Sequence, residues 1–450
     1  MALSGKTFLI LVAAGLLGLS SPSVWADEQA ERLQALEKRL EQSVQLIERL
    51  SARLAELEQL GRSGARPAVV APAAMVVPAS SQALASLEQT VAQLSEGLGR
   101  RGADSGLALH GFADVGAAWS SGKDPVKLRG FNAGTLDLYL TPQFGDRTKA
   151  LVEIAIEYGE DGALAVDMER LQLGYTVSDG LTLWLGRFHT PFGQYNTAFH
   201  HGANLQTAIF RPRFIDFEDK GGIIPAHSVG LWATGKTALA GGMLTYDGFI
   251  ANGPRIADRT LDFMAFSDNG GNKMAGFNLG YQAGGALNGL SLGLHGFGST
   301  VQVQNTAGAL LSNTRLRMAG AYLGYDEHDW EVIAETYHFA NQDLGSGTRH
   351  ASRAGFVQAG RTFGLLTPFV RLEKVSLDPR DNFFRSQASG RSYRRSAFGL
   401  RYALDAKASF KVELGSTVES AADQIDEAGA SLPFASRSYR RGAVQYSVAF

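Results

Sequence analysis

The 450-residue sequence contains no cysteine, which excludes disulfide bonds and thiolate-ligated metal sites. Charged residues make up only 19% of the chain and the net charge is −2, so no overall field attracts nucleic acid. After Ala26 no run reaches about 18 consecutive apolar residues, the length that a transmembrane helix needs. Glycine is abundant, with 53 residues, and aromatic residues reach 10%. This composition favours a β-rich fold over a helical one.

The first 26 residues form a recognisable export segment. A short polar start with Lys6 precedes an apolar run over residues 8–19, and Val24 and Ala26 fit the cleavage site of a secretory signal peptide. The alternative is a membrane anchor, but the run is shorter than the roughly 20 residues that span a bilayer. We therefore expect residues 1–26 to be a signal peptide that is removed.

A leucine repeat follows in residues 27–60. Apolar residues at heptad spacing, interrupted at Ser43, predict a coiled-coil helix. Residues 81–101 repeat the pattern as a short second helix, and residues 61–80, rich in Ala, Pro and Val, read as a linker. One alternative is a single amphipathic helix lying on the rest of the protein. Self-association into a trimer is the favoured hypothesis, because a lone helix would leave its leucine stripe in water.

Beyond residue 105 the hydrophobic period changes to two. In residues 407–419, for example, Phe410, Val412 and Leu414 alternate with Lys411 and Glu413. Segments of about ten alternating residues separated by turns are typical of a transmembrane β-barrel. We predict an all-β fold, an antiparallel transmembrane barrel of about 16 strands over residues 105–450; the alternative is a soluble sandwich or propeller. The predicted strands begin near Leu107, Phe131, Thr148, Leu164, Leu181, His227, Leu239, Met274, Leu290, Arg315, Trp330, Ser352, Leu365, Arg394, Ala408 and Tyr439.

The end of the chain favours the barrel. Val444, Tyr446, Val448 and Phe450 alternate with polar residues up to the last position. A barrel in lipid must pair its last strand with its first, because no edge can stay unpaired in hydrocarbon. The terminal Phe450 is similar to the C-terminal signal by which the barrel assembly machinery recognises bacterial outer-membrane proteins. We therefore expect an outer-membrane location, with lipid around the barrel and the coiled coil in the periplasm.

A connection of about 40 residues interrupts the strand pattern between residues 186 and 225. It opens with the sequence Gly-Arg-Phe-His-Thr-Pro-Phe-Gly at 186–193 and is rich in aromatic residues. Connections this long are usually functional or disordered, and disordered segments contain few aromatic residues. We predict an ordered, functional loop.

The 186–193 motif, the segment His-Ser-Val-Gly-Leu-Trp-Ala-Thr-Gly at 227–235 and the order of the elements together resemble the phosphate-selective porin O and P family. The resemblance implies a trimeric outer-membrane porin whose long third loop, here residues 189–225, folds inward and narrows a water-filled channel. The family's loop carries a lysine cluster. This loop has Lys220 beside Asp216, Glu218 and Asp219 and lacks that cluster.

Rings of Arg or Lys in a pore select anions. The sequence offers basic residues in the long loop and, by alternation, on the lumen side of later strands; Arg315 and Arg317 are expected on the opposite wall. Glu153, Glu157, Glu331 and Glu335 also face the lumen in this reading, and an ordinary polar lumen without a binding site is the alternative. The candidate pore-lining residues are Arg187, Arg211, Arg213, Lys220, Arg371, Arg395 and Arg401.

Histidines in the loop suggest a metal site, which is a weaker hypothesis than a pore lined by basic residues. Imidazole is a good ligand for zinc or copper, and His189, His200 and His201 lie close together in sequence. Adjacent histidines in an extended segment point in opposite directions, so polar packing or a pH-sensitive loop is favoured over a metal site. No nucleophile triad or carboxylate pair has usable spacing. We therefore expect no enzyme activity and no cofactor, although barrels with hydrolase activity exist.

The main functional hypothesis is passive diffusion of small hydrophilic solutes, with anions such as phosphate preferred. The alternative is a structural barrel that tethers the outer membrane to the cell wall through its coiled coil.

Overall fold

A computed structural model describes residues 109–125, 129–158, 164–199, 205–218, 220–262, 272–305 and 309–450. The chain divides into two units, residues 1–92 and 93–450, and every described residue belongs to the second. The predicted signal peptide, the two predicted helices and their linker lie outside the described residues, as do His200, His201 and Asp219.

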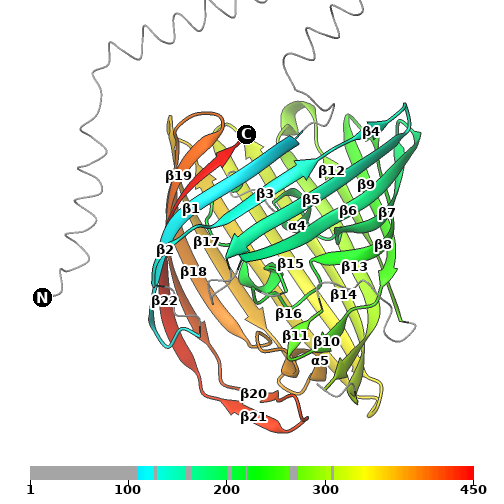
Figure 1. The fold of residues 1–450 in the computed structure, drawn as a ribbon, viewed down its shortest axis with the longest axis vertical. Coiled ribbons are helices and arrows are strands. Elements are labelled where there is room, and N and C mark those ends of the chain that lie inside the picture. Colours follow the sequence, from blue (N-terminus) through cyan, green and yellow to red (C-terminus); the bar gives the residue numbers. More distant parts are fainter. Residues whose placement is uncertain are drawn as a thin grey trace, which may run out of the picture. The chain divides into compact units, whose positions relative to one another are not determined.

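Sixteen of the described strands form one closed antiparallel barrel, as the alternating pattern predicted (Figure 1). Each strand pairs with its neighbour in the chain order given below. The barrel strands are β1 (Leu109–Gly122), β3 (Thr135–Leu140), β5 (Thr148–Tyr158), β6 (Leu164–Ser178), β7 (Leu181–His189), β8 (His227–Leu239), β9 (Gly242–Asn252), β12 (Lys273–Gln282), β13 (Leu290–Gln304), β14 (Leu310–Glu327), β15 (Trp330–Asp343), β16 (Arg349–Arg361), β17 (Leu366–Ser376), β18 (Tyr393–Ala403), β19 (Ala408–Glu419) and β22 (Arg437–Ala449).

The barrel closes where its last strand meets its first. β1 and β22 pair antiparallel from Phe112↔Ala449 to Gly122↔Tyr439. The backbones of Gly111 and Phe450 add two hydrogen bonds, of 3.2 and 3.0 Å, at the final residue. The Phe450 ring covers Gly111, where a Cβ atom would lie only 2.3 Å from it. The predicted closure of the barrel is therefore confirmed.

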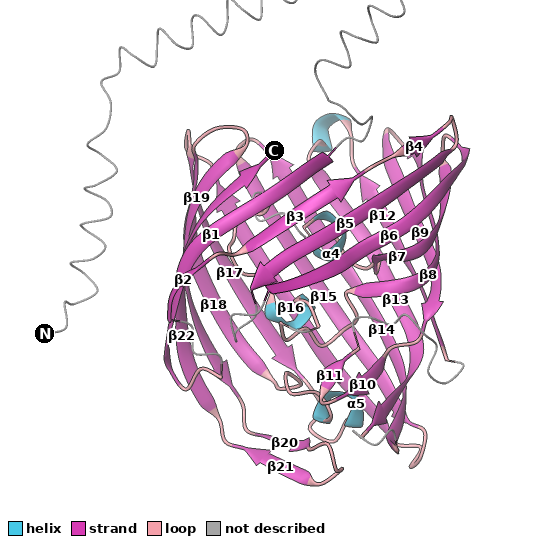
Figure 2. Cartoon of the chain, viewed as in Figure 1, coloured by secondary structure: helices cyan, strands magenta, loops and turns pink. Residues whose placement is uncertain are grey.

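The remaining elements are short (Figure 2). Two hairpins, β10–β11 and β20–β21, lie in connections between barrel strands, and β10 also pairs in parallel with β13. No helix in the described part of the chain is long and apolar enough to cross a membrane. The short elements are β2 (Arg129–Asn132), β4 (Gln143–Phe144), α4 (Tyr195–Ala198), η1 (Arg213–Ile215), β10 (Arg255–Ala257), β11 (Thr260–Leu261), η2 (Gly285–Leu287), α5 (Asn382–Arg385), β20 (Ala422–Ile425) and β21 (Ser431–Phe434).

The two faces of the strands differ in polarity. On β17, Val370 and Leu372 are about half exposed and point outward, whereas Arg371 and Glu373, which alternate with them, are buried in the interior. Successive side chains of a strand point to opposite faces, so this part of β17 turns apolar side chains outward and charged side chains inward. An apolar outer face is the composition that contact with lipid requires.

The two ends of the barrel also differ. Short turns such as Ala240–Gly241 and His328–Asp329, each with both φ angles positive, lie at the end where β1 begins and Phe450 ends. Positive φ at both positions marks the type I′ turn that suits tight hairpins. Long connections, among them residues 377–392 and 420–436, lie at the other end. In outer-membrane barrels the short turns face the periplasm and the long loops face outward.

Candidate functional site: the barrel interior

The connection between β7 and β8 folds into the barrel. We call its described residues, 190–199, 205–218 and 220–226, the inner segment; it contains α4 and η1, and Figure 1 shows α4 inside the ring of strands. Phe192, Tyr195 and Phe214 in this segment are at most 1% exposed. Their rings pack against side chains that point inward from β15 and β16. The distance between ring centroids is 5.1 Å for Phe214 and Tyr337, and 5.5 Å for Tyr195 and Phe356.

Two glycines explain the shape of the 186–193 motif. Gly186 has a φ of +131°, and a Cβ there would lie 2.0 Å from the carbonyl oxygen of Leu171. Gly193 has a φ of +63°, and its Cβ would lie 2.5 Å from Glu335 Oε2. Residues that carry a side chain rarely adopt these φ values, whereas glycine does so readily. The motif therefore uses glycine within β7, three residues before that strand ends, and at the point where the inner segment first meets β15.

Glutamates on the wall hold the backbone of the inner segment. Glu335 Oε1 on β15 accepts hydrogen bonds from the backbone N–H groups of Gln194, at 2.9 Å, and Tyr195, at 2.5 Å. Glu413 Oε2 on β19 accepts from the N–H groups of Ile209, at 2.8 Å, and Phe210, at 3.1 Å. Buried N–H groups need acceptors, and an irregular segment cannot supply them from its own backbone. These carboxylates take the place of a sheet or helix partner.

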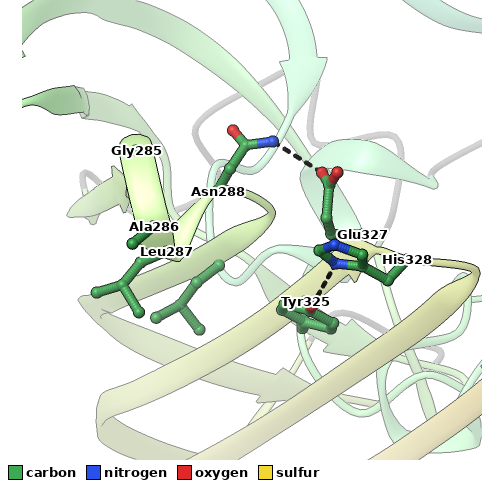
Figure 3. Close-up of a pocket in the computed structure, with 8 residues that line it drawn as sticks. Gly285, Ala286, Leu287, Asn288, Tyr325, Glu327 and His328 are labelled. Carbon is green, nitrogen blue, oxygen red and sulfur yellow. Dashed lines mark hydrogen bonds between the residues drawn. The ribbon is translucent and has the colours of Figure 1, made fainter.

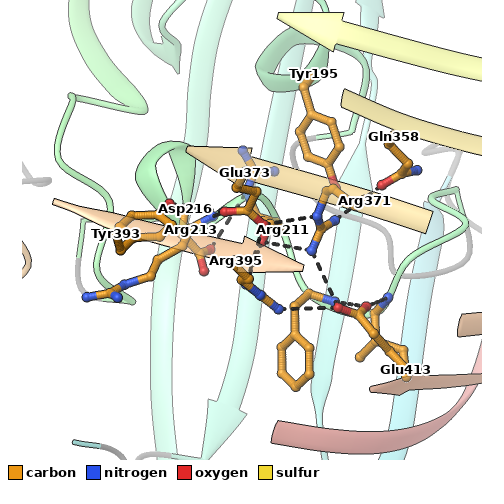
Figure 4. Close-up of polar contacts among 12 residues, drawn as sticks. Tyr195, Arg211, Arg213, Asp216, Gln358, Arg371, Glu373, Tyr393, Arg395 and Glu413 are labelled. Carbon is orange, nitrogen blue, oxygen red and sulfur yellow. Dashed lines mark hydrogen bonds and ion pairs between the residues drawn. The ribbon is translucent and has the colours of Figure 1, made fainter. Parts of the chain in front are cut away.

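Arginines on the same wall bind both the glutamates and the segment (Figure 4). Arg371, which is fully buried, donates from Nε to Glu373 Oε1 at 3.0 Å and from Nη2 to Glu413 Oε1 at 3.4 Å. Arg395 donates from Nη2 to Glu413 Oε1 at 3.2 Å. Both guanidinium groups also donate to the carbonyl oxygen of Arg211, at 3.4 and 3.5 Å. Arg371 and Arg395 thus clamp the segment to the wall.

The two arginines of the inner segment do different things. Arg213 donates from Nη1 to Glu419 Oε1 at 2.5 Å and to the Tyr439 hydroxyl at 3.1 Å, so it fastens the segment to β19 and β22. Arg211 is 5% exposed and donates from Nη1 to the carbonyl oxygen of Phe199, at 2.5 Å. It therefore braces the segment from within.

The other candidates from the sequence occupy separate positions. Arg187 is 3% exposed and donates from Nε to the carbonyl oxygen of Glu169 at 3.0 Å. Arg401 on β18 is partly buried. The side chain of Lys220 is 44% exposed, and its Nζ lies 2.7 Å from Glu157 Oε2 on β5. Of the seven candidates, Arg371, Arg395, Arg211 and Arg213 meet at one place, whereas Arg187 and Lys220 lie near β5 and β6.

The expectation for Arg315 and Arg317 is wrong. Both are exposed, and Leu316 and Met318, their neighbours on β14, belong to the buried interior cluster. The sequence predicts the alternation on β14 correctly but places the wrong face inside. The interior beside β14 is filled by apolar side chains, among them Phe384, so the apolar face of the strand points inward there.

Carboxylates dominate the wall formed by β1, β3, β5 and β6. Glu153 is fully buried, and its partners are Arg170 and the His189 ring, whose Nε2 lies 3.4 Å from Glu153 Oε2. The carboxylates on these strands are Asp114, Asp137, Glu153, Glu157, Asp167 and Glu169. The barrel thus has an acidic wall on β1, β3, β5 and β6. It has a more basic wall on β17, β18 and β22, which carry Arg371, Arg395 and Arg441.

Histidines lie at the point where the inner segment rejoins the wall. The rings of His189 and His227 have centroids 5.7 Å apart. His227 Nε2 lies 2.7 Å from Glu169 Oε2 and its Nδ1 lies 3.1 Å from Glu218 Oε2, so an imidazolium with two N–H donors fits both carboxylates. Within the described residues, no three His, Asp or Glu side chains converge on a position that could hold a metal ion.

Burial affects the titration of two groups in the inner segment. It raises the pKa of the Tyr195 phenol to about 12, and the hydroxyl donates to Gln206 Oε1 at 2.6 Å. Burial also raises the pKa of the Asp216 carboxyl, against the opposing effect of the Arg211 guanidinium 3.8 Å away. The charged form of a carboxylate is less stable when water is removed from it.

A separate pocket of about 480 Å³ lies at the short-turn end (Figure 3). It is lined by residues of two turns, around Leu287 and around Glu327. Asn288 Nδ2 donates to Glu327 Oε2 at 2.8 Å, and the Tyr325 hydroxyl lies 3.2 Å from His328 Nδ1. None of the wall arginines lines this pocket, so it is separate from the interior site.

Sequence reasoning missed the role of three glutamates. Glu373, Glu413 and Glu419 are all at most 4% exposed and each binds the inner segment. Their inward direction follows from alternation, which was visible in the sequence for Glu413 and Glu419. Their partners were not, because these lie about 160 to 206 residues away along the chain.

Comparison with known proteins supports the fold. No family model matches the sequence and no curated protein matches it. The structure is similar to that of an anion-selective porin from Comamonas acidovorans, with a TM-score of 0.53 and 16% identity over 76% of this chain and 99% of that one. OmpT, an outer-membrane protein of Vibrio cholerae, gives a TM-score of 0.48 at 10% identity, over 76% of this chain and 97% of that one. The outer-membrane channel DcaP of Acinetobacter baumannii gives 0.47 at 12%, with the same coverage. At such identities the likeness to the Comamonas porin shows a porin-like barrel fold and nothing finer.

Proposed function

We propose that the protein is an outer-membrane channel for the passive diffusion of small hydrophilic solutes. The observation that carries the proposal is a closed barrel with an apolar exterior and a charged interior, into which the inner segment folds. An apolar band around a barrel is stable in lipid, and a polar lumen holds water. In this proposal the inner segment sets the width of the channel.

Reconstitution of the full chain in planar lipid bilayers tests the proposal. We expect stepwise increases in current, each from one inserted molecule or assembly. A membrane that stays closed while the protein is shown to be folded and inserted would reject the channel.

Anion preference is a narrower form of the proposal. Arg371 and Arg395 on the wall and Arg213 on the inner segment supply positive charge, but each is paired with Glu373, Glu413 or Glu419. Their N–H donors are engaged, so any preference arises from the summed field and not from free arginines that coordinate an anion. The reversal potential in a salt gradient measures it; a preference for cations would reject this form.

Membership in the phosphate-selective porin O and P family is narrower still. The 186–193 motif, with Gly186 and Gly193 in conformations that favour glycine, supports it. The test is whether phosphate blocks chloride current. If phosphate at millimolar concentration leaves the current unchanged, phosphate selectivity is excluded while the channel proposal stands.

The assembly and tethering proposals depend on other parts of the chain. We propose trimer formation, which fits a porin-like barrel, and recognition by the barrel assembly machinery through Phe450, whose backbone pairs with Gly111 where the barrel closes. The proposed periplasmic coiled coil, and with it the alternative of a cell-wall tether, concerns residues outside the described part of the chain. Deleting residues 27–100 separates the two functions: a tether loses its binding to the cell wall, whereas a channel keeps its conductance.

A further inference from the structure

Three long connections meet at the long-loop end of the barrel. We call residues 253–262, 377–392 and 420–436 together the mouth bridge. They begin on β9, β17 and β19. β9 and β12 are the seventh and eighth strands of the barrel, and β19 and β22 are the fifteenth and sixteenth, so the first and third connections start half a circumference apart. Figure 2 shows the β20–β21 hairpin and α5 together at this end.

Arg259 joins the first connection to the third. It occupies the tip of the β10–β11 hairpin, where Asp258 and Arg259 both have positive φ, of 49° and 61°. Its Nη2 donates to Gln424 Oε1 at 2.6 Å, and its guanidinium lies 5.7 Å from the centroid of the Phe434 ring. Positive φ is uncommon for residues other than glycine. The turn therefore holds Arg259 in a conformation that its contacts across the mouth help to maintain.

Gln424 is the centre of the bridge and is only 1% exposed. Besides accepting from Arg259, it donates from Nε2 to the carbonyl oxygens of Gln387 and Ala388, at 2.7 and 3.2 Å, in the second connection. The Ala388 N–H in turn donates to the carbonyl oxygen of Arg259 at 2.9 Å. Every connection is thus hydrogen-bonded to both of the others at a junction whose central side chain, Gln424, is buried.

Further contacts fix the second and third connections to each other. Arg385 on α5 donates from Nε to the carbonyl oxygen of Asp423, at 2.9 Å, and pairs with its carboxylate at 3.0 Å. Arg391 donates from Nη2 to the carbonyl oxygens of Ser420 and Ala435, at 2.9 and 2.8 Å. The bridge thus has several independent fastenings.

The bridge is also anchored to the wall and reaches toward the inner segment. Asn341 Nδ2 on β15 donates to Asp381 Oδ2 at 2.8 Å, and the Phe384 ring packs edge-on against Phe339, with centroids 5.2 Å apart. A Cβ on Gly221 of the inner segment would lie 3.0 Å from Ser389 Oγ. The bridge is therefore a braced structure and not a set of free surface loops.

From these contacts we infer that the mouth bridge is a second size filter, in series with the inner segment, and that the contacts of Arg259, Gln424 and Arg385 hold it across the outer mouth. The inference rests on the proposed channel function. Loops joined across a mouth divide its cross-section, so a solute must pass beside them before it reaches the inner segment. Releasing the contacts lets the connections move apart and admits larger solutes.

Two variants test the filter: one keeps the length of the connections, and the other shortens one of them. The first, Arg259→Met with Arg385→Met, removes the side-chain contacts of these two arginines within the bridge and keeps its length. The second replaces residues 422–434 with a short Gly-Ser linker and removes the β20–β21 hairpin. Arg380→Met is the matched control: it removes one positive charge from the second connection, where Arg380 pairs with the nearby Asp378 and its side chain is 78% exposed. Folding is checked by the difference in gel mobility between heated and unheated samples.

The readout is the swelling rate of proteoliposomes in uncharged sugars of increasing size, because uncharged solutes isolate size from the altered charge. We expect both bridge variants to shift the exclusion limit to larger sugars, and the control to keep the limit of the unmodified protein. An unchanged limit in both folded variants, with normal conductance, overturns the filter and leaves the channel intact. Absence of both conductance and swelling in the unmodified protein overturns the channel, and the filter with it.

Discussion

Nη2 of Arg371 lies 3.4 Å from Oε1 of Glu413, and both side chains are fully buried. The other oxygen of Glu413 accepts the backbone N–H groups of Ile209 and Phe210, while Arg371 donates to the carbonyl oxygen of Arg211. One ion pair on the wall thus binds three consecutive residues of the inner segment. Because its two charges are paired with each other, this ion pair shapes the interior mainly by fixing the position of the inner segment.

The first prediction concerns this pair. Arg371→Met leaves Glu373 and Glu413 with one fewer cation, and removing one partner of a buried ion pair costs about 3–5 kcal/mol. We expect a lower free energy of unfolding, measured by urea titration of the barrel in lipid. The double variant Arg371→Met/Glu413→Gln should recover part of the loss because it removes the unpaired charge. If Arg371→Met lowers the free energy of unfolding by less than about 1 kcal/mol, which is the contribution of an exposed ion pair, the clamp is contradicted.

The second prediction separates charge selectivity from bracing. Lys220 is exposed enough to act on passing ions, and its removal leaves the nearby Glu157 carboxylate with less positive charge beside it. We expect Lys220→Gln to shift the reversal potential toward cation preference at low salt. The shift should shrink at about 1 M salt, where the screening length falls to about 3 Å.

Arg211→Met is the comparison for Lys220→Gln, because it removes the same charge from a side chain that is 5% exposed and bonded within the segment. We expect Arg211→Met to lower the free energy of unfolding and to increase the noise of the current, and to shift the reversal potential less than Lys220→Gln does. If Arg211→Met shifts the reversal potential more than Lys220→Gln does, Arg211 lines the pore and the bracing role is wrong.

The third prediction tests the glycine motif. Gly186→Ala would place a Cβ 2.0 Å from a backbone oxygen at a φ of +131°, and Gly193→Ala would press on Glu335 at a φ of +63°. Such conformations cost about 1–3 kcal/mol for other residues. We expect both variants to unfold at lower urea concentration, Gly186→Ala more so because backbone yields less than a side-chain tip.

Gly248→Ala is the control for the glycine variants, since a Cβ there meets nothing within 4 Å. It should match the unmodified protein. Equal stability of all three variants would show that the motif's glycines are not required by the backbone.

Alternation predicted the barrel well because it depends only on local geometry. A period of two fixes which residues share a face, and Arg371, Arg395 and Glu335 accordingly point inward as expected. It does not say which face is inside. On β14 the expected inward direction of Arg315 and Arg317 is wrong, because the interior beside this strand is filled by apolar side chains and the apolar face of β14 packs against them.

The inner segment could be recognised from the sequence but its contacts could not. Its length and aromatic content mark it as ordered, and its glycines fit the turns it makes. An irregular segment has no period, so nothing local tells that Arg211 bonds back to Phe199 while Arg213 reaches Glu419. Those partners are set by where β19 passes the segment in three dimensions, which is a property of the whole barrel.

The last prediction concerns the other anchor, Glu335. Its carboxylate accepts the N–H groups of Gln194 and Tyr195 and the Tyr337 hydroxyl. Glu335→Ala leaves these buried donors without that acceptor, at about 1–3 kcal/mol for each unsatisfied group. Because they lie where the inner segment first meets β15, we expect this end to detach and to fluctuate in the lumen.

Single-channel recordings measure this fluctuation directly. Glu335→Ala should broaden the open-state current and raise its mean, because a loosened segment no longer holds one width. Glu335→Gln keeps an amide oxygen at the same place, so it should accept the Gln194 and Tyr195 N–H groups and stay close to the unmodified protein. Open-state noise in Glu335→Ala equal to that of Glu335→Gln would mean that the other contacts of the segment, among them the aromatic contacts of Phe192, Tyr195 and Phe214, hold it in place without Glu335.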